Sequence, residues 1–278
     1  MGKSNNMDTR AYITLLSSKD YLNGVIVLHR SLGNTGAKYP LYCVLSTSVD
    51  NETEQKLVNE GIKCIRLNSV AVENDANANG GALSYWNYTF DKLFVWGLTQ
   101  FEKIVFLDSD MMVVRNIDSL FECEPFSAVD ADSWYPGNGN WRGYLNSGIM
   151  VITPDVDVQN SLLQLVDKVV EEGRRQNIAV GDQDVIKSYL TEWNKQTSLH
   201  LDQGYNLFAD HLTYYMRHLG YVLDGENGKH VFVIHFVGRW KPWMNNSLKD
   251  WMCLLKKCMK NPGYYRIYKM YLRFLKND

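Results

Sequence analysis

The sequence predicts an α/β fold with a mostly parallel, doubly wound sheet, and two patterns carry this prediction. Short apolar runs alternate with stretches of helical periodicity along the chain. The apolar runs are continuous rather than alternating with polar residues, which is typical of strands buried on both faces of a sheet. Because each helix must cross over between neighbouring strands, we expect a parallel sheet with helices on both faces.

Each expected element follows from such a run or period. The expected strands lie at residues 11–16, 41–45, 64–67, 103–107, 111–114, 127–130, 149–152, 221–223 and 231–234. The helical periods lie at residues 21–32, 51–60, 90–98, 158–172 and 182–190. Cap chemistry precedes the first three helices, in residues 17–20, in Asp50 and in Thr89.

Two segments are expected to be loops. Residues 68–84 are polar, rich in Gly, Asn and Ala, and without periodicity. Residues 131–143 are rich in Gly and aromatic residues, including Trp134, Tyr135 and Trp141. Segments of this kind are often functional lids or specificity loops, and they are also often plain insertions.

Composition limits the classes of function. The chain has 278 residues, of which 45% are hydrophobic, and a net charge of −2, which gives no sign of nucleic-acid binding. The first residues lack the apolar core of a signal peptide, and no apolar run is long enough to span a bilayer. The five cysteines show no zinc-type spacing, so we expect free thiols and a cytoplasmic protein.

The last part of the chain has a different character. We expect one domain at residues 8–245 and a basic amphipathic helical tail at residues 246–278. Apolar residues of the tail recur at helical spacing, with eight Lys and Arg residues among them. Such a tail could lie on an anionic membrane as a peripheral contact, or it could pack its apolar face on the domain and leave its lysines in water.

The chemistry is expected to centre on Asp108-Ser109-Asp110, which follows the apolar run 103–107. If the chain stays extended there, both carboxylates lie on the same side and repel each other. A divalent cation between them would relieve this repulsion and could hold phosphates. The alternative is a solvated strand end followed by a turn.

His235 follows the apolar run 231–234 and therefore takes the same position in the predicted fold as Asp108. Two carboxylates and an imidazole form a mixed O/N site, which suits Mn²⁺ and permits Co²⁺ or Mg²⁺. A lone histidine is more often a hydrogen-bonded core residue. However, Gly238 and Lys241 follow it, and they would allow backbone approach to a phosphate and supply positive charge.

Seven motifs occur in one order along residues 11–243. They are Thr14-Leu15, Asp91-Lys92-Leu93, Phe106-Leu107-Asp108-Ser109-Asp110, Asn116-Ile117-Asp118, Asn146-Ser147-Gly148, Gly181-Asp182-Gln183 and the segment 235–243. In order and spacing they resemble the glycogenin group of the family-eight retaining glycosyltransferases. The resemblance implies a single GT-A domain, which is Rossmann-like with a mostly parallel sheet, and a Mn²⁺-dependent nucleotide-sugar site.

The resemblance also implies roles for individual residues. The implied metal ligands are Asp108, Asp110 and His235. The implied donor and acceptor contacts are Leu15, Ser17 and Tyr21 near uracil and ribose, Lys92 near the sugar and phosphate, Ser109 beside the metal ligands, Asn146, Ser147 and Gly148 at the sugar and acceptor, and Gly238 and Lys241 at the diphosphate. The implied catalytic residues are Lys92 and the pair beside the anomeric carbon, Asp182 and Gln183.

The implied reaction transfers glucose or galactose from a UDP-sugar, with retention, to a glycan, protein or lipid-linked acceptor. Retention needs either a carboxylate nucleophile, for which Asp182 is the candidate, or a front-face attack, and the sequence leaves both routes open. Asp182 also suits a helix N-cap. Ala179 stands where the glycogen primers of the family have an aspartate, so the donor sugar is left open.

Two alternative functions are compatible with the sequence. Tyr205-Asn206, followed by Tyr214-Tyr215, would allow a glycogenin-like self-glucosylating primer with a tyrosine acceptor. A chain that has lost catalysis would remain a nucleotide-sugar or glycan-binding protein, but the intact set of acidic and basic residues argues against this. A homodimer is compatible with either function.

Overall fold

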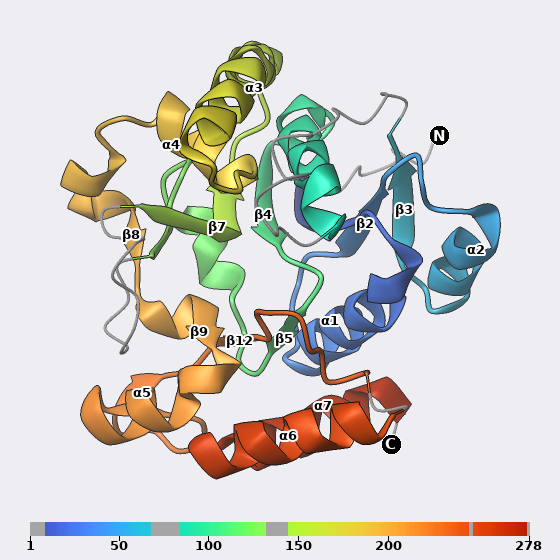
Figure 1. Ribbon diagram of the computed structural model, residues 1–278, viewed down its shortest axis with the longest axis vertical. Coiled ribbons are helices and arrows are strands. Elements are labelled where there is room, and N and C mark those ends of the chain that lie inside the picture. The colour runs from blue at the N-terminus through green and yellow to red at the C-terminus, as the bar shows by residue number, and fades with distance from the viewer. Residues whose placement is uncertain (1–8, 68–83, 132–143, 245–246, 277–278) are drawn as a thin grey trace, which may run out of the picture.

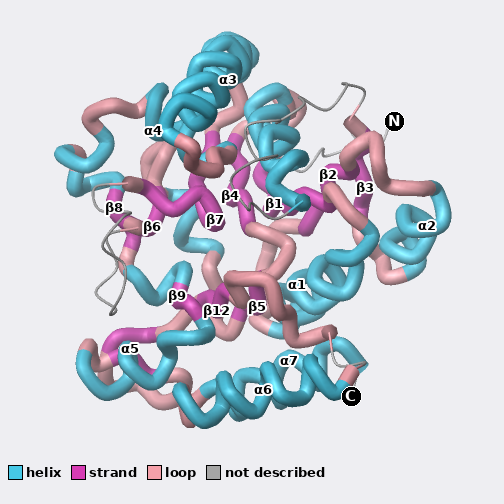
Figure 2. The backbone as a smooth tube through the Cα atoms, viewed as in Figure 1, coloured by secondary structure: helices cyan, strands magenta, loops and turns pink. Residues whose placement is uncertain are grey.

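The computed structural model describes residues 9–67, 84–131, 144–244 and 247–276. Its centre is a seven-stranded sheet with the strand order β3-β2-β1-β4-β7-β6-β8 (Figures 1 and 2). The strands of this sheet are β1 (Arg10–Leu16), β2 (Leu41–Leu45), β3 (Lys63–Arg66), β4 (Lys103–Leu107), β6 (Ala128–Asp130), β7 (Leu145–Ile152) and β8 (His200–Leu201). The expected α/β class with a mainly parallel sheet is confirmed.

Strand direction divides the sheet into two parts. Strands β3, β2, β1 and β4 are parallel to one another, as the strand–helix alternation predicts. Strand β7 pairs antiparallel with both β4 and β6, and β6 pairs parallel with β8. The antiparallel strand therefore lies directly beside β4, at whose end Asp108 stands.

Two smaller sheets accompany the main one. One has the order β5-β12-β9 and consists of β5 (Met111–Val113), β12 (Val233–His235) and β9 (Leu207–Phe208). The other pairs β10 (Tyr221–Val222) with β11 (Lys229–His230). Because β5 follows β4 after a short turn, the three-stranded sheet begins where the main sheet ends.

The helices alternate with the strands. The α-helices are α1 (Leu22–Asn34), α2 (Asn51–Asn59), α3 (Val156–Gln176), α4 (Asp182–Tyr189), α5 (Leu212–His218), α6 (Leu248–Lys260) and α7 (Tyr264–Lys276). The 3₁₀ segments are η1 (Lys19–Tyr21), η3 (Ser84–Gly97), η4 (Asp118–Glu122), η5 (Trp193–Lys195), η6 (Thr197–Leu199), η7 (Gln203–Asn206) and η8 (Ala209–His211).

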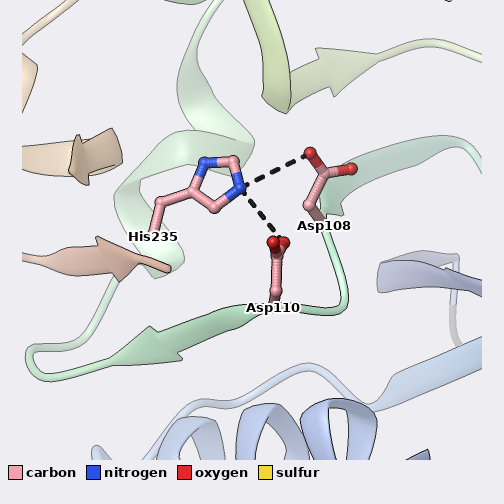
Figure 3. A group of neighbouring side chains, drawn as sticks. All are labelled: Asp108, Asp110 and His235. Atoms are coloured by element: carbon pink, nitrogen blue, oxygen red, sulfur yellow. Dashed lines mark hydrogen bonds and ion pairs between the residues drawn. The ribbon is translucent and has the colours of Figure 1, made fainter. Parts of the chain in front are cut away.

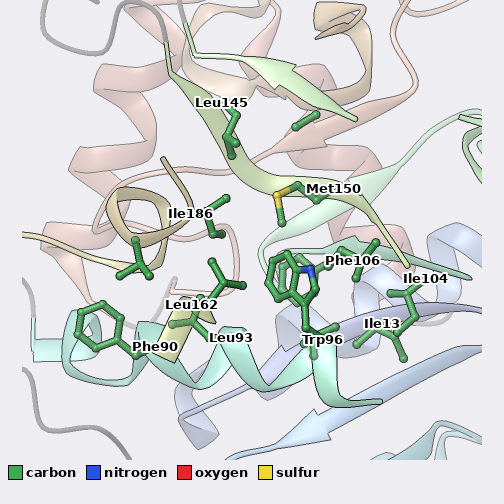
Figure 4. Packing of buried hydrophobic residues seen from close by; sticks show 14 of the residues in the cluster. Ile13, Phe90, Leu93, Trp96, Ile104, Phe106, Leu145, Met150, Leu162 and Ile186 are labelled. Atoms are coloured by element: carbon green, nitrogen blue, oxygen red, sulfur yellow. The ribbon is translucent and has the colours of Figure 1, made fainter. Parts of the chain in front are cut away.

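The core shows why the strands read as continuous apolar runs. On one face of the sheet, Ile13, Ile104 and Phe106 pack against η3, α3 and α4, as Figure 4 shows. On the other face, Tyr12 and Val105 pack in a separate cluster with residues of α1 and η4. Successive side chains point to opposite faces, and both faces are covered, so apolar residues are needed at every position.

Three expected boundaries are wrong in instructive ways. The segment before β4 is a 3₁₀ helix that begins at Ser84, so Thr89 lies within it and does not cap it. Strand β7 already includes Asn146, Ser147 and Gly148, and His235 is the last residue of β12 rather than the residue after it. Polar residues at these positions line a site, so the apolar run begins after the start of β7 and ends before the end of β12. Most of the expected loop 68–84, together with 132–143 of the second loop, lies outside the described residues.

The tail forms two helices, α6 and α7, which lie side by side along the lower edge of the view in Figure 1. Helix α7 packs on the domain, because Tyr264, Ile267, Tyr268 and Tyr271 are buried in the cluster around the three-stranded sheet. Arg30 of α1 also donates hydrogen bonds to the last carbonyls of α7, at 2.8 and 3.0 Å. Among the described residues, none of the helices is long and apolar enough to cross a membrane.

Candidate functional site

A cleft of about 300 Å³ opens where the main sheet meets the three-stranded sheet. It brings together every residue that the family resemblance implies as a metal ligand, a donor or acceptor contact or a catalytic residue: Leu15, Ser17, Tyr21, Lys92, Asp108, Ser109, Asp110, Asn146, Ser147, Gly148, Asp182, Gln183, His235, Gly238 and Lys241. Four further residues, Thr89, Gly181, Asp184 and Val237, also line it. The residues come from distant parts of the chain, so the fold rather than local sequence assembles the cleft.

Asp108 and Asp110 are held by different sheets. Asp108 follows β4, and its backbone N–H donates to Gly148 O of β7 at 2.8 Å. Asp110 precedes β5, and its carbonyl accepts from the N–H of Phe236, just beyond β12, at 3.0 Å. The chain between them turns at Ser109 and Asp110, so the extended continuation considered from the sequence is wrong. The two carboxylates converge because Asp108 is hydrogen-bonded to β7 of the main sheet and Asp110 to the residue after β12 of the three-stranded sheet. The cleft lies where these two sheets meet.

His235 completes a group of three candidate metal ligands. Its Nε2 lies 3.0 Å from Asp110 Oδ1 and 3.8 Å from Asp108 Oδ2, as Figure 3 shows. One ligand atom from each residue lies within 4.8 Å of the others. Two carboxylates and an imidazole at this separation fit a divalent ion that accepts mixed oxygen and nitrogen ligands.

Two asparagines fix the tautomer of His235. The N–H of Gly148 donates to Asn146 Oδ1 at 2.9 Å, so this oxygen is an acceptor, and Asn206 Nδ2 donates to it at 2.8 Å. The amide oxygen of Asn206 then lies 2.8 Å from His235 Nδ1 and accepts a hydrogen bond from the Nδ1–H group. When the ring is neutral, the lone pair of Nε2 faces the two carboxylates, and a cation between them would bind it.

Asn206 was not assigned to the site from the sequence. A metal-binding histidine usually donates its other ring nitrogen to a nearby acceptor, so some partner for His235 could be expected. No sequence signal identifies which residue that is, because Asn206 lies on η7, far from His235 and Asn146 along the chain.

Lys92 is the buried cation on one side of the cleft. Its Nζ lies 2.8 Å from Asp182 Oδ2 and 3.0 Å from Asp108 Oδ1, and it also contacts Ser147 at 3.3 Å. Burial alone would lower the pKa of Lys92, but the two carboxylates outweigh burial and raise it. Lys92 is therefore charged at neutral pH and joins the metal-ligand group to Asp182.

Lys241 is the buried cation on the other side. Its Nζ lies 2.5 Å from Asp110 Oδ2 and 2.8 Å from the carbonyl of Phe236. Burial opposes ionisation of Asp110, yet Lys241 and His235 outweigh it and hold the pKa of Asp110 below its ordinary value. For Asp108 burial dominates and its pKa is raised. The two carboxylates thus differ in their affinity for a proton, although they are only two residues apart in the sequence.

Asp182 faces the cleft rather than capping its helix. Gly181 is the N-cap of α4, and Asp184 Oδ2 accepts the N–H of Gly181 at 2.9 Å. The carboxylate of Asp182 instead accepts from Ser147 Oγ at 2.7 Å, while Gln183 Oε1 accepts from the N–H of Ser147 at 3.1 Å. The N-cap interpretation of Asp182 is therefore wrong, and Asp182 and Gln183 hold Ser147 together.

Glycine is required at two positions in the cleft. A Cβ at Gly148 would lie 2.9 Å from His235 Cε1 and 3.0 Å from Asp108 Oδ2, so only glycine lets β7 pass this close to the ligand group. Gly238 has a φ of 89°, in the left-handed region that side chains rarely adopt. Both features keep backbone, rather than side chains, at the wall of the cleft.

The tyrosine pair of the self-priming alternative lies elsewhere. Tyr215 is 1% exposed in the core around the three-stranded sheet, and its hydroxyl donates to Gln203 at 3.3 Å. Tyr214 is half-buried and packs beside His218 on α5. Neither tyrosine lines the cleft.

The chain is similar in sequence to known glycosyltransferases. The model of the family described as Glycosyl transferase family 8 matches residues 12–247. Glycogenin-1 of Caenorhabditis elegans is 32% identical over 241 residues, which is 86% of this chain and 52% of the relative. UDP-glucuronate:xylan alpha-glucuronosyltransferase 2 of Arabidopsis thaliana is 28% identical over 249 residues, which is 87% of this chain and 37% of the relative.

The fold is also similar to that of solved structures. The galactosyltransferase LgtC, in complex with donor and acceptor sugar analogues, superimposes with a TM-score of 0.60 at 13% identity, covering 96% of this chain and 95% of LgtC. At this identity the likeness concerns the fold alone. The chain spans about half of the length of the nematode glycogenin and less of the plant enzyme.

Proposed function

Because the chain belongs to glycosyl transferase family 8, we propose that it is a Mn²⁺-dependent retaining glycosyltransferase that uses UDP-glucose or UDP-galactose. The observation that carries the proposal is the group of Asp108, Asp110 and His235, which lies in one cleft with the two buried lysines. The glycosyltransferase domain is proposed to comprise residues 8–245, followed by the helical tail at 246–278.

Asp108, Asp110 and His235 would hold the metal ion, for which Mn²⁺ is proposed and Mg²⁺ or Co²⁺ could substitute. The donor set supports this choice, because it offers both carboxylate oxygen and imidazole nitrogen within 4.8 Å. When bound, the ion would offset negative charge on the donor diphosphate. Side chains of the protein would bind the donor and orient the sugar.

The donor is proposed to lie along the cleft from Leu15 to Asp182. Leu15, Ser17 and Tyr21 line the end that would take the uracil and ribose, and Ser109 adjoins the ligand group. Lys241 already binds an anionic oxygen, since it contacts Asp110, and a diphosphate would offer it further anionic partners. The backbone at Gly238 can approach that diphosphate without a side chain in between.

The sugar is proposed to lie against Lys92, Asp182 and the start of β7 at Asn146 and Ser147. As the bond between the anomeric carbon and the phosphate oxygen breaks, negative charge grows on the diphosphate, and a fixed buried cation such as Lys241 stabilises it. Oδ2 of Asp182 already contacts Lys92 and Ser147, which reduces its nucleophilic strength. We therefore favour front-face attack, in which the acceptor hydroxyl bonds to the anomeric carbon on the side from which the diphosphate leaves and gives its proton to that diphosphate. Asp182 and Gln183 then orient the groups beside the anomeric carbon.

The acceptor is proposed to be a glycan, a protein or a lipid-linked saccharide. Self-glucosylation at Tyr214 or Tyr215 is the less favoured alternative, because Tyr215 is buried and neither residue lines the cleft. A binding protein without catalysis is also less favoured, because all the predicted catalytic side chains share one cleft. A cytoplasmic location is proposed on the basis of five free cysteines, and a homodimer remains a proposal without a specific interface.

The decisive experiment incubates the full chain with a panel of UDP-sugars and Mn²⁺, and follows UDP release and transfer to candidate acceptors. We expect one hexose donor to be consumed, and we expect NMR of the product to show the anomeric configuration of the donor. Asp110→Ala should abolish Mn²⁺-dependent UDP binding in calorimetry, whereas Asp167→Ala, on the exposed side of α3, should not. Unchanged UDP affinity in Asp110→Ala would refute the metal assignment.

A further inference from the structure

Helix α6 carries an apolar stripe that faces solvent. Its five members are Leu248, Trp251, Met252, Leu255 and Met259, each with 51–79% of its surface exposed. At about 100° of rotation per residue they fall within a stripe roughly 100° wide along the helix. Nine large hydrophobic residues are exposed in the described part of the chain, so more than half of them gather on this one helix.

Three lysines line one edge of this stripe. Lys249, Lys256 and Lys260 are exposed and follow one another at helical spacing. The fourth lysine of the helix, Lys257, points the other way and forms an ion pair with Asp210 on the domain at 2.6 Å. The helix thus presents apolar side chains flanked by positive charge on its outer side and uses its remaining residues for docking.

Positive charge is concentrated in this part of the molecule. The segment 247–278 holds eight Lys and Arg and only two Asp, although the whole chain has a net charge of −2. On α7 the exposed residues include Arg266, Lys269 and Arg273. A basic segment on an otherwise acidic protein indicates an anionic partner.

The stripe is held in a fixed position. Ser247 caps α6, and Asp250 accepts the N–H of Ser247 at 3.1 Å. At the other end, Asn261 is buried, and its side chain contacts the domain through Thr213 N at 3.0 Å and Ala209 O at 2.6 Å. Because both ends are fixed and only Leu254 of α6 is buried, the exposed stripe is a feature of the folded tail rather than of a frayed end.

We propose that α6 binds an anionic phospholipid bilayer, lying flat on it with the apolar stripe among the headgroups and acyl chains. Lys249, Lys256 and Lys260 then contact lipid phosphates at one edge of the stripe. Helices with a charged face, a narrow apolar face and a tryptophan bind membranes in this way without spanning them. The proposal does not depend on the chemistry of the cleft, so the two can fail separately.

The test is flotation of the full chain with vesicles of phosphatidylcholine alone and with vesicles that contain about one third phosphatidylglycerol. We expect binding to the anionic vesicles only, and we expect added salt to weaken it because salt screens charge. Trp251→Glu combined with Leu255→Glu should reduce binding by roughly tenfold or more. The triple variant Lys249→Gln, Lys256→Gln and Lys260→Gln should reduce it on anionic vesicles.

Matched control variants lie elsewhere on the surface. Val58→Glu changes an exposed apolar residue of α2, and Lys38→Gln with Lys168→Gln and Lys195→Gln removes three exposed lysines. These controls should bind vesicles as the unaltered chain does, and thermal unfolding checks that every variant is folded. Absence of flotation with anionic vesicles, or equal flotation of the Trp251 and Leu255 variant, overturns the proposal. A dimer in sedimentation that this same variant dissociates would assign the stripe to a second copy instead.

Discussion

At the scale of single residues, the orientation of His235 rests on two amide side chains. The backbone N–H of Gly148 makes the amide oxygen of Asn146 an acceptor, and Asn206 donates to that oxygen. The amide oxygen of Asn206 then accepts from Nδ1 of the imidazole. The ring is therefore oriented before any ligand arrives, and reorientation does not oppose binding. Asn206 binds Asn146 and His235, and within the described part of the chain it forms no hydrogen bond with either carboxylate.

Replacing Asn206 tests this arrangement. Asn206→Leu removes the acceptor for His235 Nδ1 and leaves the tautomer unspecified. We expect the affinity for Mn²⁺, measured with UDP present by calorimetry, to fall by about 10- to 100-fold. Asn59→Ala, at the exposed end of α2, serves as the control and should retain full affinity. Equal affinity in both variants would show that His235 does not depend on Asn206.

Replacing Lys241 should change the affinity for Mn²⁺ and the affinity for UDP in opposite directions. Its ammonium group now neutralises Asp110, so it competes with a cation for that carboxylate. Lys241→Met should raise the affinity for Mn²⁺ alone by about tenfold, or ~1.4 kcal/mol, and should lower the affinity for UDP in the presence of Mn²⁺ by a similar factor. Both constants come from calorimetry. A change of the same sign in both would contradict the exchange of partners.

The centre of the site could be predicted from local rules, whereas Leu15, Ser17, Tyr21 and Lys92 were assigned through the family resemblance. Asp108-Ser109-Asp110 stands after a strongly apolar run, and Gly238 and Lys241 stand shortly after a strand, where a parallel sheet places its ligands. Asn206 could not be predicted, since its role depends on a contact with His235 across the fold. The N-cap role of Asp182 was plausible from position alone, yet Gly181 is the N-cap of α4 and Asp184 accepts its N–H.

At the scale of elements, one side chain of α1 adds polar contacts to the apolar docking of α7. Arg30 donates to the carbonyls of Phe274 and Leu275 and pairs with Glu60 at 2.6 Å, so it joins α1, α2 and α7. A cation at a helix C-terminus also interacts favourably with the helix dipole. The tail is therefore fixed to the domain at its far end.

Arg30→Met should destabilise the chain by about 1–2 kcal/mol, because three acceptors lose a charged donor that is mostly buried. Urea unfolding followed by circular dichroism measures this change. Arg10→Met is the matched control, since Arg10 also pairs with a glutamate, Glu122, but at the surface. We expect the control to change stability only slightly. Equal losses in both variants would mean that the α7 contacts add nothing.

The elements that the sequence predicted well are those with a local cause. Continuous apolar runs gave β1, β2 and β4 because both faces of the sheet are covered, and Asp50 capped α2 as expected. The antiparallel direction of β7 could not be predicted, because pairing direction depends on the path of the chain rather than on local pattern. The 3₁₀ character of η3 could not be predicted either. The division of the tail into α6 and α7 falls at Asn261-Pro262-Gly263, which is a local helix-breaking signal in the sequence.

At the scale of the whole molecule, two half-buried histidines make stability depend on pH. Burial lowers the pKa of His29 and of His211 below the ordinary value of 6.5. Each therefore binds a proton more readily in the unfolded chain than in the folded one. Stability is complete above the unfolded pKa and is lost as the pH falls toward the lowered folded pKa.

We expect the free energy of unfolding to decrease between about pH 7 and pH 5. Urea unfolding at a series of pH values measures the slope. His29→Gln and His211→Gln should each remove part of that slope, while His218→Gln, on an exposed residue, should leave it unchanged. A slope that persists in the double variant would mean that other groups cause the pH dependence.

The turn at Asp108-Ser109-Asp110 is a covalent link between the two sheets, and its carboxylates belong to opposite sides of that boundary. An ion held by both carboxylates would form a second, non-covalent link across the same boundary. Free energy of binding adds to the free energy of unfolding when only the folded state binds. Amide hydrogen exchange in β5 and β12 should therefore slow when Mn²⁺ and UDP bind, whereas exchange in the distant helix α2 should stay the same.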